Sequence, residues 1–408
     1  MNSRLLTFFR NADWLTADRV SAYARIFVAV LIVCAIGWVA MSNGLLDPAG
    51  HPIGTDFLNV YAAGLMADRG QAAAAYDWPT HRAVEASIVD YDGYFGWHYP
   101  PMFLFLAAPL ALLPYLAALA FYLAMTFTAY LLAMRRLVRG LPGVLWLAAG
   151  FPAVFVNLGH GQNGFLTAAL LGFGFSCLQG SPLIAGALLG CLAYKPQFAI
   201  LLPIALLAGG HWRSVIAAGA SAGALALASL LVFGWPTWLA FFASFEPTRT
   251  IVLEQGGTGW EKIVSVFSAI RMLGGQIWLA YAFQTTTTLV ITALVGLVWW
   301  RSKRAGFSVG CLALAIPLTT PYVLDYDLMV LSIGVLALGR EGIQTGFRPW
   351  EKTMLMLVTL SPLAARGIGH ALHIPIEPPI LIITLTLFAA RLMTRSTESE
   401  SLPVFSTP

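Results

Sequence analysis

The chain has 408 residues, of which 58% are hydrophobic and only 10% are charged. Average soluble domains carry about a quarter charged residues, so this composition, with a mean hydropathy of +0.76, excludes a soluble globule, a disordered chain and a fibrous protein. The formal net charge is only +4, and most basic residues stand in short segments between apolar runs, which argues against nucleic acid as a partner. We therefore predict an all-α, polytopic transmembrane helical bundle.

Apolar runs predict the membrane-spanning elements in chain order. They cover residues 22–41, 101–134, 141–158, 164–179, 182–194, 196–209, 212–234, 276–300, 306–321, 326–339, 353–366 and 379–394. Several are shorter than the ~20 residues that a perpendicular helix needs, which is tolerated where protein covers the backbone. The run 101–134 is too long for one crossing, and Pro109 and Pro114 predict a broken or interfacial helix followed by a full one. We expect one integral membrane domain over 1–395 with about 12 crossings, and a polar, disordered cytoplasmic tail over 396–408.

Lysine and arginine set the orientation of these helices. The segments Arg135–Arg139 and Arg301–Arg304 are the clearest cytoplasmic markers. If 101–134 crosses once, both segments and most of the 23 Lys and Arg residues fall on the side of the N-terminus, and most acids fall on the other. The pattern predicts a multi-pass protein of the bacterial inner (plasma) membrane with both termini in the cytoplasm. Two long segments, 42–100 and 235–275, then face the periplasm or exterior.

The first long outer segment contains a candidate catalytic acid. Asp56 lies in a GTDF stretch and precedes an amphipathic stretch, which includes Tyr61 and ends near Arg69. Aspartate is a favoured N-cap residue. Asp56 is therefore expected either to cap this helix or to serve as a catalytic carboxylate at the membrane surface, and the spacing alone leaves both readings open.

Aromatic residues gather where the same segment enters the membrane. His98 and Tyr99 precede Pro100 and Pro101, and prolines in the first helical turn fix the path of the chain. The aromatic rings here either form an interfacial belt or stack on sugar rings.

Two short outer turns are rich in polar side chains. The turn 159–164 carries His160, Gln162 and Asn163. Lys195 lies between two short apolar runs, where a lysine is costly unless it snorkels to the surface or has a partner. The alternative to snorkelling is an anion site, most simply for a phosphate, to which the N-terminal amides of the next helix would contribute.

Two acids and a further lysine complete the polar outer residues. Asp325 and Asp327 lie between two apolar runs, just after Tyr322. One acid is expected to cap the following helix, and the other to bind a sugar hydroxyl, a basic partner or an ion. Lys262 follows glycines that indicate a mobile turn, so the segment 235–275 is a candidate substrate lid.

The order of these motifs resembles glycosyltransferase family 87. A GTDFxxxYxAG-like stretch is followed by YPP, GQN, YKPQ and TPYxxxYD, between about Gly54 and Asp327. Relatives of that family include polyprenyl-phosphate-mannose-dependent mannosyltransferases and arabinofuranosyltransferases of the mycobacterial cell envelope. The resemblance implies a GT-C-type fold with its active site at the outer face. It also implies inverting transfer of a hexose or pentose from a polyprenyl-phosphate donor to a lipid or glycan acceptor.

The resemblance further implies roles for single residues. Asp56 would be the general base. Lys195, Gln162 and Asn163 would lie near the donor phosphate and sugar, and His160, from the same turn as Gln162, is a further candidate for the donor phosphate. The remaining candidates for binding substrate are Tyr61, His98, Tyr99, Lys262, Tyr322, Asp325 and Asp327. No cofactor is expected, and a divalent ion at the two late acids is the less favoured alternative.

One motif departs from the family pattern. The mannosyltransferase members carry a His-containing SPxSWxHH-like stretch late in the chain, whereas this chain has TTPYVLDYD at 319–327. A role carried by that histidine is not transferred, and mannose is not assigned as the sugar.

Other classes of function are weighed against this one. A lipid or small-molecule transporter or flippase would carry charged residues near the bilayer midplane and often inverted repeats, whereas this chain shows no repeat and groups its polar residues at one face. A non-catalytic scaffold would need neither Lys195 nor Asp327. A polysaccharide polymerase or ligase typically has an arginine-rich outer loop, and the segment 235–275 carries only two arginines.

Overall fold

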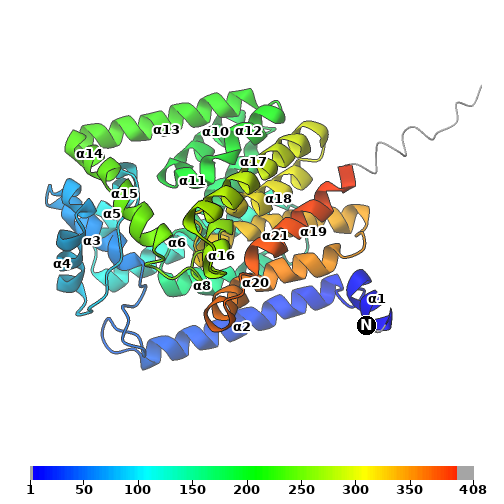
Figure 1. Ribbon diagram of the computed structural model, residues 1–408, viewed down its shortest axis with the longest axis horizontal. Coiled ribbons are helices and arrows are strands. Elements are labelled where there is room, and N and C mark those ends of the chain that lie inside the picture. Colours follow the sequence, from blue (N-terminus) through cyan, green and yellow to red (C-terminus); the bar gives the residue numbers. More distant parts are fainter. Residues whose placement is uncertain (1–2, 393–408) are drawn as a thin grey trace, which may run out of the picture.

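The computed structural model describes residues 3–392, and within this part the regular structure is helical, with isolated β-bridges but no strand (Figure 1). Among the described residues, six helical segments are long and apolar enough to cross a membrane: α2 (Ala17–Met41), α6 (Tyr115–Leu137), α13 (Trp212–Phe233), α17 (Ile277–Arg301), η6 with α19 (Asp325–Thr345), and α20 (Glu351–Leu372). Large apolar side chains lie on the outside of these helices, for example Ile36 of α2, which is 65% exposed. Such a surface is expected where lipid surrounds the protein. The predicted fold class, an all-α polytopic membrane protein, is confirmed.

The other apolar runs form shorter helices. These are α9 (Gly164–Cys177), α10 (Pro182–Gly190), α11 (Pro196–Ala199), α12 (Leu201–Ala208), α18 (Ala305–Ala315) and α21 (Glu377–Ala389). The 3₁₀ turns η3 (Cys191–Tyr194) and η5 (Ile316–Thr319) extend α10 and α18. α9 is buried along most of its length, so neighbouring helices cover it as expected for a short segment. The number of crossings, about 12, stays a prediction.

Proline divides two of the predicted runs. The run 101–134 contains η2 (Pro101–Phe103), α5 (Leu104–Ala111) and α6, which begins directly after Pro114. This is the expected broken helix followed by a full one. The run 141–158 also divides, into α7 (Val144–Ala149) and α8 (Ala153–His160), because Pro152 cannot donate a backbone hydrogen bond.

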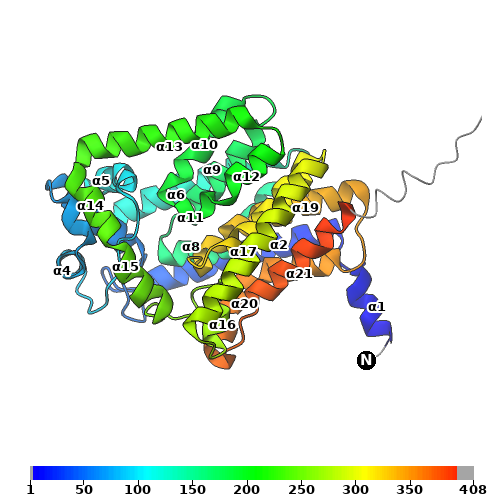
Figure 2. The ribbon, with the colours of Figure 1, turned by 45° about the horizontal axis from the view of Figure 1, so that its top comes forward.

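The two long segments that are predicted to lie outside the membrane, called the outer segments below, fold against each other. The segment 42–100 contains α3 (Phe57–Asp68), η1 (Ala72–Tyr76) and α4 (Trp78–Ile88), and the segment 235–275 contains α14 (Trp235–Ala243), α15 (Phe245–Pro247), the π-helical η4 (Thr248–Glu254) and α16 (Val266–Met272). The rings of Tyr76 and Phe241 lie 5.8 Å apart. Figures 1 and 2 both show α3, α4 and α14 together at one end of the molecule.

α3 is buried on nearly all sides, so the prediction of an amphipathic stretch is wrong. All residues from Phe57 to Gly64 are buried, so this part of the helix has no solvent-facing side. The backbone of α5 approaches so closely that a Cβ on Gly64 would lie 2.2 Å from the carbonyl oxygen of Ala107. Glycine is needed here because no side chain fits between the two helices.

Contacts near the two ends of α6 show where this helix lies in the bundle. Gly143, in the loop after α6, lies beside Ser21 near the start of α2. At the other end of α6, the hydroxyl of Tyr115 donates to the carbonyl oxygen of Ile53 at 2.8 Å. α6 therefore runs between the outer segment and the end that holds α1 (Ser3–Asn11) (Figure 1). The predicted tail 396–408 lies outside the described residues.

Candidate active site

Asp56 precedes α3 without capping it. The residue occupies the N-cap position, but its side chain makes no capping hydrogen bond. Its backbone N–H donates to the carbonyl oxygen of His160 at 3.0 Å. Of the two readings that the sequence leaves open, capping is therefore wrong. Asp56 is only 7% exposed, so its carboxylate needs other partners.

A tight turn brings α8 to this segment. Gly161 has φ +64°, and a Cβ there would lie 2.8 Å from the Cβ of Phe57. Thr55 Oγ1 lies 2.9 Å from Nδ1 of His160, 105 residues further along the chain. Glycine tolerates both the left-handed backbone and the close approach, so Gly161 allows the two segments to meet.

Three side chains surround the Asp56 carboxylate. Gln162 Nε2 donates to Oδ2 at 3.3 Å and His160 Nδ1 lies 3.9 Å from Oδ2. Lys262 Nζ lies 3.6 Å from Oδ1. Burial raises the pKa of Asp56, but the neighbouring charges and hydrogen bonds outweigh burial, Lys262 most of all, and the pKa lies below its usual value. Asp56 is therefore ionised at neutral pH.

The orientation of the Gln162 amide is fixed by Tyr99 and Asn163. Gln162 Oε1 accepts from the Tyr99 hydroxyl and from the Asn163 backbone N–H, both at 3.0 Å. Asn163 Nδ2 donates to the same hydroxyl at 2.8 Å. Because two donors share the Gln162 oxygen, its NH₂ group is the one turned toward Asp56.

Asp325 and Arg366 close the far side of His160. Asp325 Oδ1 lies 4.0 Å from His160 Nε2, and Arg366 Nη1 lies 3.4 Å from both His160 Nε2 and Asp325 Oδ2. Burial lowers the pKa of His160, so the ring is neutral at pH 7. The Arg366 side chain is 49% exposed and forms the open edge of the group. We refer to the following residues as the carboxylate cluster: Asp56, His160, Gln162, Lys262, Asp325 and Arg366.

Arg366 is the member of the carboxylate cluster that the sequence analysis missed. It stands at the end of the apolar run 353–366, within the membrane-length helix α20. An arginine in such a helix is costly unless it has a partner or a function. This cost was the sequence signal that could have identified Arg366 as a candidate site residue. That its partner is Asp325 is seen only in the structure.

Lys195 is paired rather than snorkelled, so the snorkelling alternative is wrong. It is 3% exposed, donates to Asp327 Oδ1, and its Nζ lies 5.2 Å from the ring centroid of Tyr326. The other oxygen of Asp327 accepts from the backbone N–H of Leu324 at 3.2 Å. Asp327 is therefore the late acid that caps its helical turn at Leu324, whereas Asp325 accepts from the backbone N–H of Tyr326 at 2.9 Å.

Three predicted substrate-binding residues have partners outside the carboxylate cluster. Tyr61 donates to the carbonyl oxygen of Leu113 at 2.7 Å. His98 Nδ1 lies 3.0 Å from Thr248 Oγ1, which joins the two outer segments. Tyr322 packs against the small apolar cluster between α16 and α17. The structure does not bring these three side chains to Asp56.

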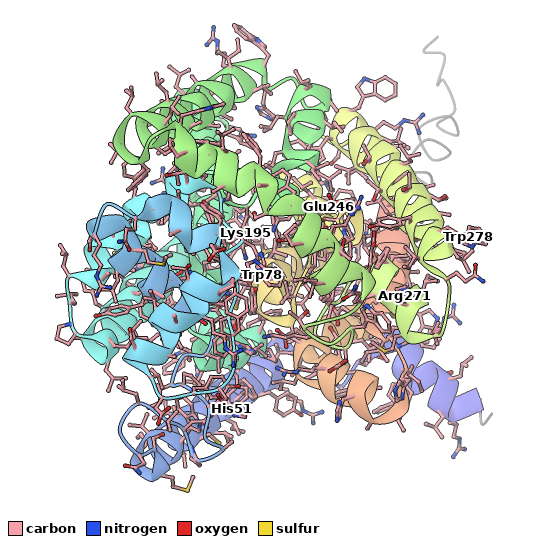
Figure 3. All side chains as sticks on the ribbon, turned by 60° about the vertical axis from the view of Figure 1, so that its left-hand side comes forward. His51, Trp78, Lys195, Glu246, Arg271 and Trp278 are labelled. Atoms are coloured by element: carbon pink, nitrogen blue, oxygen red, sulfur yellow. The ribbon has the colours of Figure 1, made fainter. Side chains whose placement is uncertain are left out.

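A second buried polar pair belongs to α4, which begins at Trp78, labelled in Figure 3. His81 Nε2 lies 3.4 Å from Glu85 Oε1, with the two residues 0% and 2% exposed. Neither ring nitrogen of His81 has a hydrogen-bond partner among the described residues. Burial raises the pKa of Glu85, and the charge of Asp56 adds to that effect. Buried polar atoms without a protein partner are where a water or a ligand hydroxyl is expected; the i, i+4 spacing was the only sequence signal.

Comparison with known proteins gives one match. The family model of glycosyltransferase family 87 matches residues 97–321, more than half of the chain. No curated protein and no solved structure matches. The matched part includes Tyr99, Gln162 and Lys262, whereas Asp56 lies before it.

Proposed function

Because the chain belongs to glycosyltransferase family 87 and is therefore a membrane glycosyltransferase, we propose that it transfers a hexose or pentose from a polyprenyl-phosphate donor. The acceptor is a lipid or a glycan, and the reaction takes place at the extracytoplasmic face of the bacterial inner membrane. The observation that carries the proposal is the carboxylate of Asp56 beside Lys262. This carboxylate is buried and ionised, and it makes no capping hydrogen bond. Such a carboxylate suits the role of general base.

The proposed transfer inverts the anomeric carbon. The acceptor hydroxyl attacks this carbon on the face opposite the phosphate, and the new C–O bond forms as the bond to the phosphate oxygen breaks. The phosphate leaves with the electron pair, and the hydroxyl proton passes to Asp56.

The leaving phosphate needs positive charge near it. The side chains of Lys262 and Arg366 are 14% and 49% exposed, whereas that of Lys195 is 4% exposed and bound to Asp327. We therefore assign the first contact with the phosphate to Lys262 and Arg366, and place Lys195 behind them.

Movement of Lys262 toward the phosphate would also activate the base. Lys262 is the largest influence that lowers the pKa of Asp56. When its charge is engaged by the phosphate, the pKa of Asp56 rises toward the working pH, where a general base is most effective. The neutral ring of His160 and the amides of Gln162 and Asn163 are the hydrogen-bonding groups for the sugar.

No cofactor enters this scheme. Within residues 3–392, no three His, Cys, Asp or Glu side chains are grouped so that they would hold a metal ion. Independence of a divalent metal stays a prediction, and assay with and without a chelator checks it.

The decisive experiment offers the protein in nanodiscs a panel of radiolabelled polyprenyl-phosphate sugars and nucleotide sugars. We expect transfer or sugar release from one lipid donor, and loss of at least a hundredfold in Asp56→Asn. Asp92→Asn is the matched control, because Asp92 lies in the same outer segment with its side chain fully exposed. Full activity of Asp56→Asn would remove Asp56 from catalysis. Binding of a lipid donor without turnover would favour the transporter reading.

A further inference from the structure

A cavity of about 740 Å³ lies between the end of α17, the start of α18 and the ends of α19 and α21. Its charged lining residues are Arg301, Lys303, Arg304, Glu341, Arg348 and Arg391. Five cations therefore share this lining with one acid. We call it the basic cavity.

Carboxylates among residues 3–392 neutralise only part of this positive charge. Arg304 pairs with Glu341, and Arg391 pairs with Glu351 of α20. The lining cations that form no ion pair with a residue in the range 3–392 are Arg301, Lys303 and Arg348, and all three are exposed. Three cations without such an ion pair therefore line one cavity, and an anion bound between them would reduce their mutual repulsion.

The basic cavity lies at the opposite end of the bundle from the carboxylate cluster. The segment Asp325–Thr345 is 21 residues long, begins in the carboxylate cluster and ends in the cavity lining. At 1.5 Å per residue it is about 30 Å long, which is the thickness of the hydrocarbon core. α20 also runs from one site to the other, with Glu351 beside the cavity and Arg366 in the carboxylate cluster.

Aromatic and apolar side chains mark the membrane surface beside the cavity. Trp300 is 66% exposed and lies next to Arg301, whose guanidinium carbon is 5.7 Å from the indole ring. Ile343 of α19 is 58% exposed. Tryptophan and arginine at the end of a membrane helix are typical of the headgroup level.

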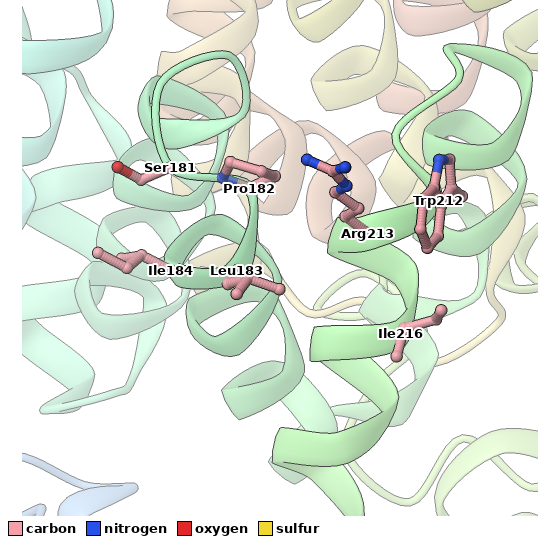
Figure 4. Close-up of a pocket in the computed structure, with 7 residues that line it drawn as sticks. All are labelled: Ser181, Pro182, Leu183, Ile184, Trp212, Arg213 and Ile216. Atoms are coloured by element: carbon pink, nitrogen blue, oxygen red, sulfur yellow. The ribbon is translucent and has the colours of Figure 1, made fainter.

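A second cavity provides a comparison. It has a volume of about 640 Å³ and lies between the starts of α10 and α13 (Figure 4). Its lining is apolar except for Ser181 and Arg213, and Arg213 lies over the ring of Trp212 at 5.5 Å. Both cavities lie between helix ends, and of these two the basic cavity is the one with several cations that form no ion pair within residues 3–392.

We propose that the basic cavity binds the phosphate headgroup of an anionic glycerophospholipid. The phosphate pairs with Arg301, Lys303 and Arg348, and the acyl chains follow the exposed apolar surface near Trp300 and Ile343. Basic pockets between membrane helices bind such headgroups. The adjoining apolar surface favours a lipid over a free anion, because only a lipid covers both.

Lipid retention by the full chain tests this inference. The protein is exchanged into detergent with phosphatidylglycerol or phosphatidylcholine, and bound lipid is counted by native mass spectrometry. We expect the wild type to retain phosphatidylglycerol and the triple variant Arg301→Gln/Lys303→Gln/Arg348→Gln to lose it at least tenfold. The matched control removes the same charge outside the cavity, as Arg135→Gln/Arg136→Gln/Arg139→Gln, and is expected to keep the lipid. Arg213→Gln tests the second cavity in the same way.

Three results would overturn the inference. They are equal retention of the two lipids, equal loss in the cavity variant and the control, and displacement of the lipid by millimolar inorganic phosphate, which would indicate a site for soluble anions. Thermal unfolding of each variant shows whether it is folded. Sugar transfer is not the readout, so failure here leaves the proposed function untouched, and failure of that function leaves this site untouched.

Discussion

At the scale of single residues, each of three buried carboxylates has its own cation. Asp56 lies near Lys262, Asp325 near Arg366, and Asp327 near Lys195. A buried charge without a partner is expensive, so these pairings explain how acids are tolerated beside the membrane. The cations differ in exposure, since the side chains of Lys262 and Arg366 are 14% and 49% exposed and that of Lys195 is 4% exposed.

The first residue-scale prediction concerns pH. Lys262→Met removes the largest influence that lowers the pKa of Asp56, while burial, which raises it, remains. A base must be deprotonated to act, so the acidic limb of the pH–rate profile is expected to move to higher pH, together with a lower kcat. Lys352→Met, a lysine outside the carboxylate cluster, should leave the limb in place. An unchanged limb in Lys262→Met would contradict the proposed coupling.

The second residue-scale prediction concerns stability. Lys195→Met leaves Asp327 buried without its cation, which is expected to cost about 3–5 kcal/mol. The double variant Lys195→Met/Asp327→Asn should recover most of this loss, because the asparagine oxygen still accepts from Leu324. Thermal unfolding in one detergent measures both. Additive losses in the double variant would show that the two side chains are not coupled.

At the scale of elements, α3 begins directly after Asp56 and packs closely against α5. Gly64 is the contact point, and it lies on the same helix that Asp56 precedes. Rigid elements position catalytic groups more reliably than loops do. Packing at Gly64 should therefore influence both stability and the position of the carboxylate.

The element-scale prediction compares two glycines. Gly64→Ala forces α3 away from α5, because the contact is with backbone, and is expected to cost about 1–3 kcal/mol and to lower transfer activity. Gly219→Ala in α13 is the control, since a Cβ there meets nothing within 4 Å and alanine favours a helix. Thermal unfolding and transfer assays are compared for the two. Equal stability would show that α3 and α5 adjust freely.

At the scale of the whole molecule, the polar groups separate into two ends. The carboxylate cluster and both long outer segments occupy one end, and the basic cavity occupies the other. Positive charge is enriched on the cytoplasmic side of membrane proteins. We therefore expect the basic cavity in the cytoplasm and the carboxylate cluster outside.

Labelling with a membrane-impermeant maleimide tests this topology. In a background without the four native cysteines, His51→Cys is expected to react in intact cells, whereas Arg139→Cys should react only after permeabilisation. Both positions are exposed. The reversed pattern would invert the orientation, and labelling of both from outside would contradict a single crossing by α6.

The sequence by itself determined the class of fold, the break at Pro114 and the positions of the polar turns along the chain. These follow from local properties, since apolar length sets a membrane helix and proline ends one. Family motifs added a function because their order is preserved along the chain. Composition also indicated the basic segments that mark one side of the bundle.

Only the tertiary structure decided which partner each polar side chain has. The sequence left capping and catalysis equally open for Asp56, and the structure shows that its side chain does not cap the helix and has His160, Gln162 and Lys262 around it. Lys195 meets Asp327 across 132 residues, and Arg366 reaches its acid from a helix with no motif. Electrostatic pairing depends on distances of a few ångströms between segments far apart in sequence. Such distances are set by the packing of whole elements, and a local sequence pattern does not predict that packing.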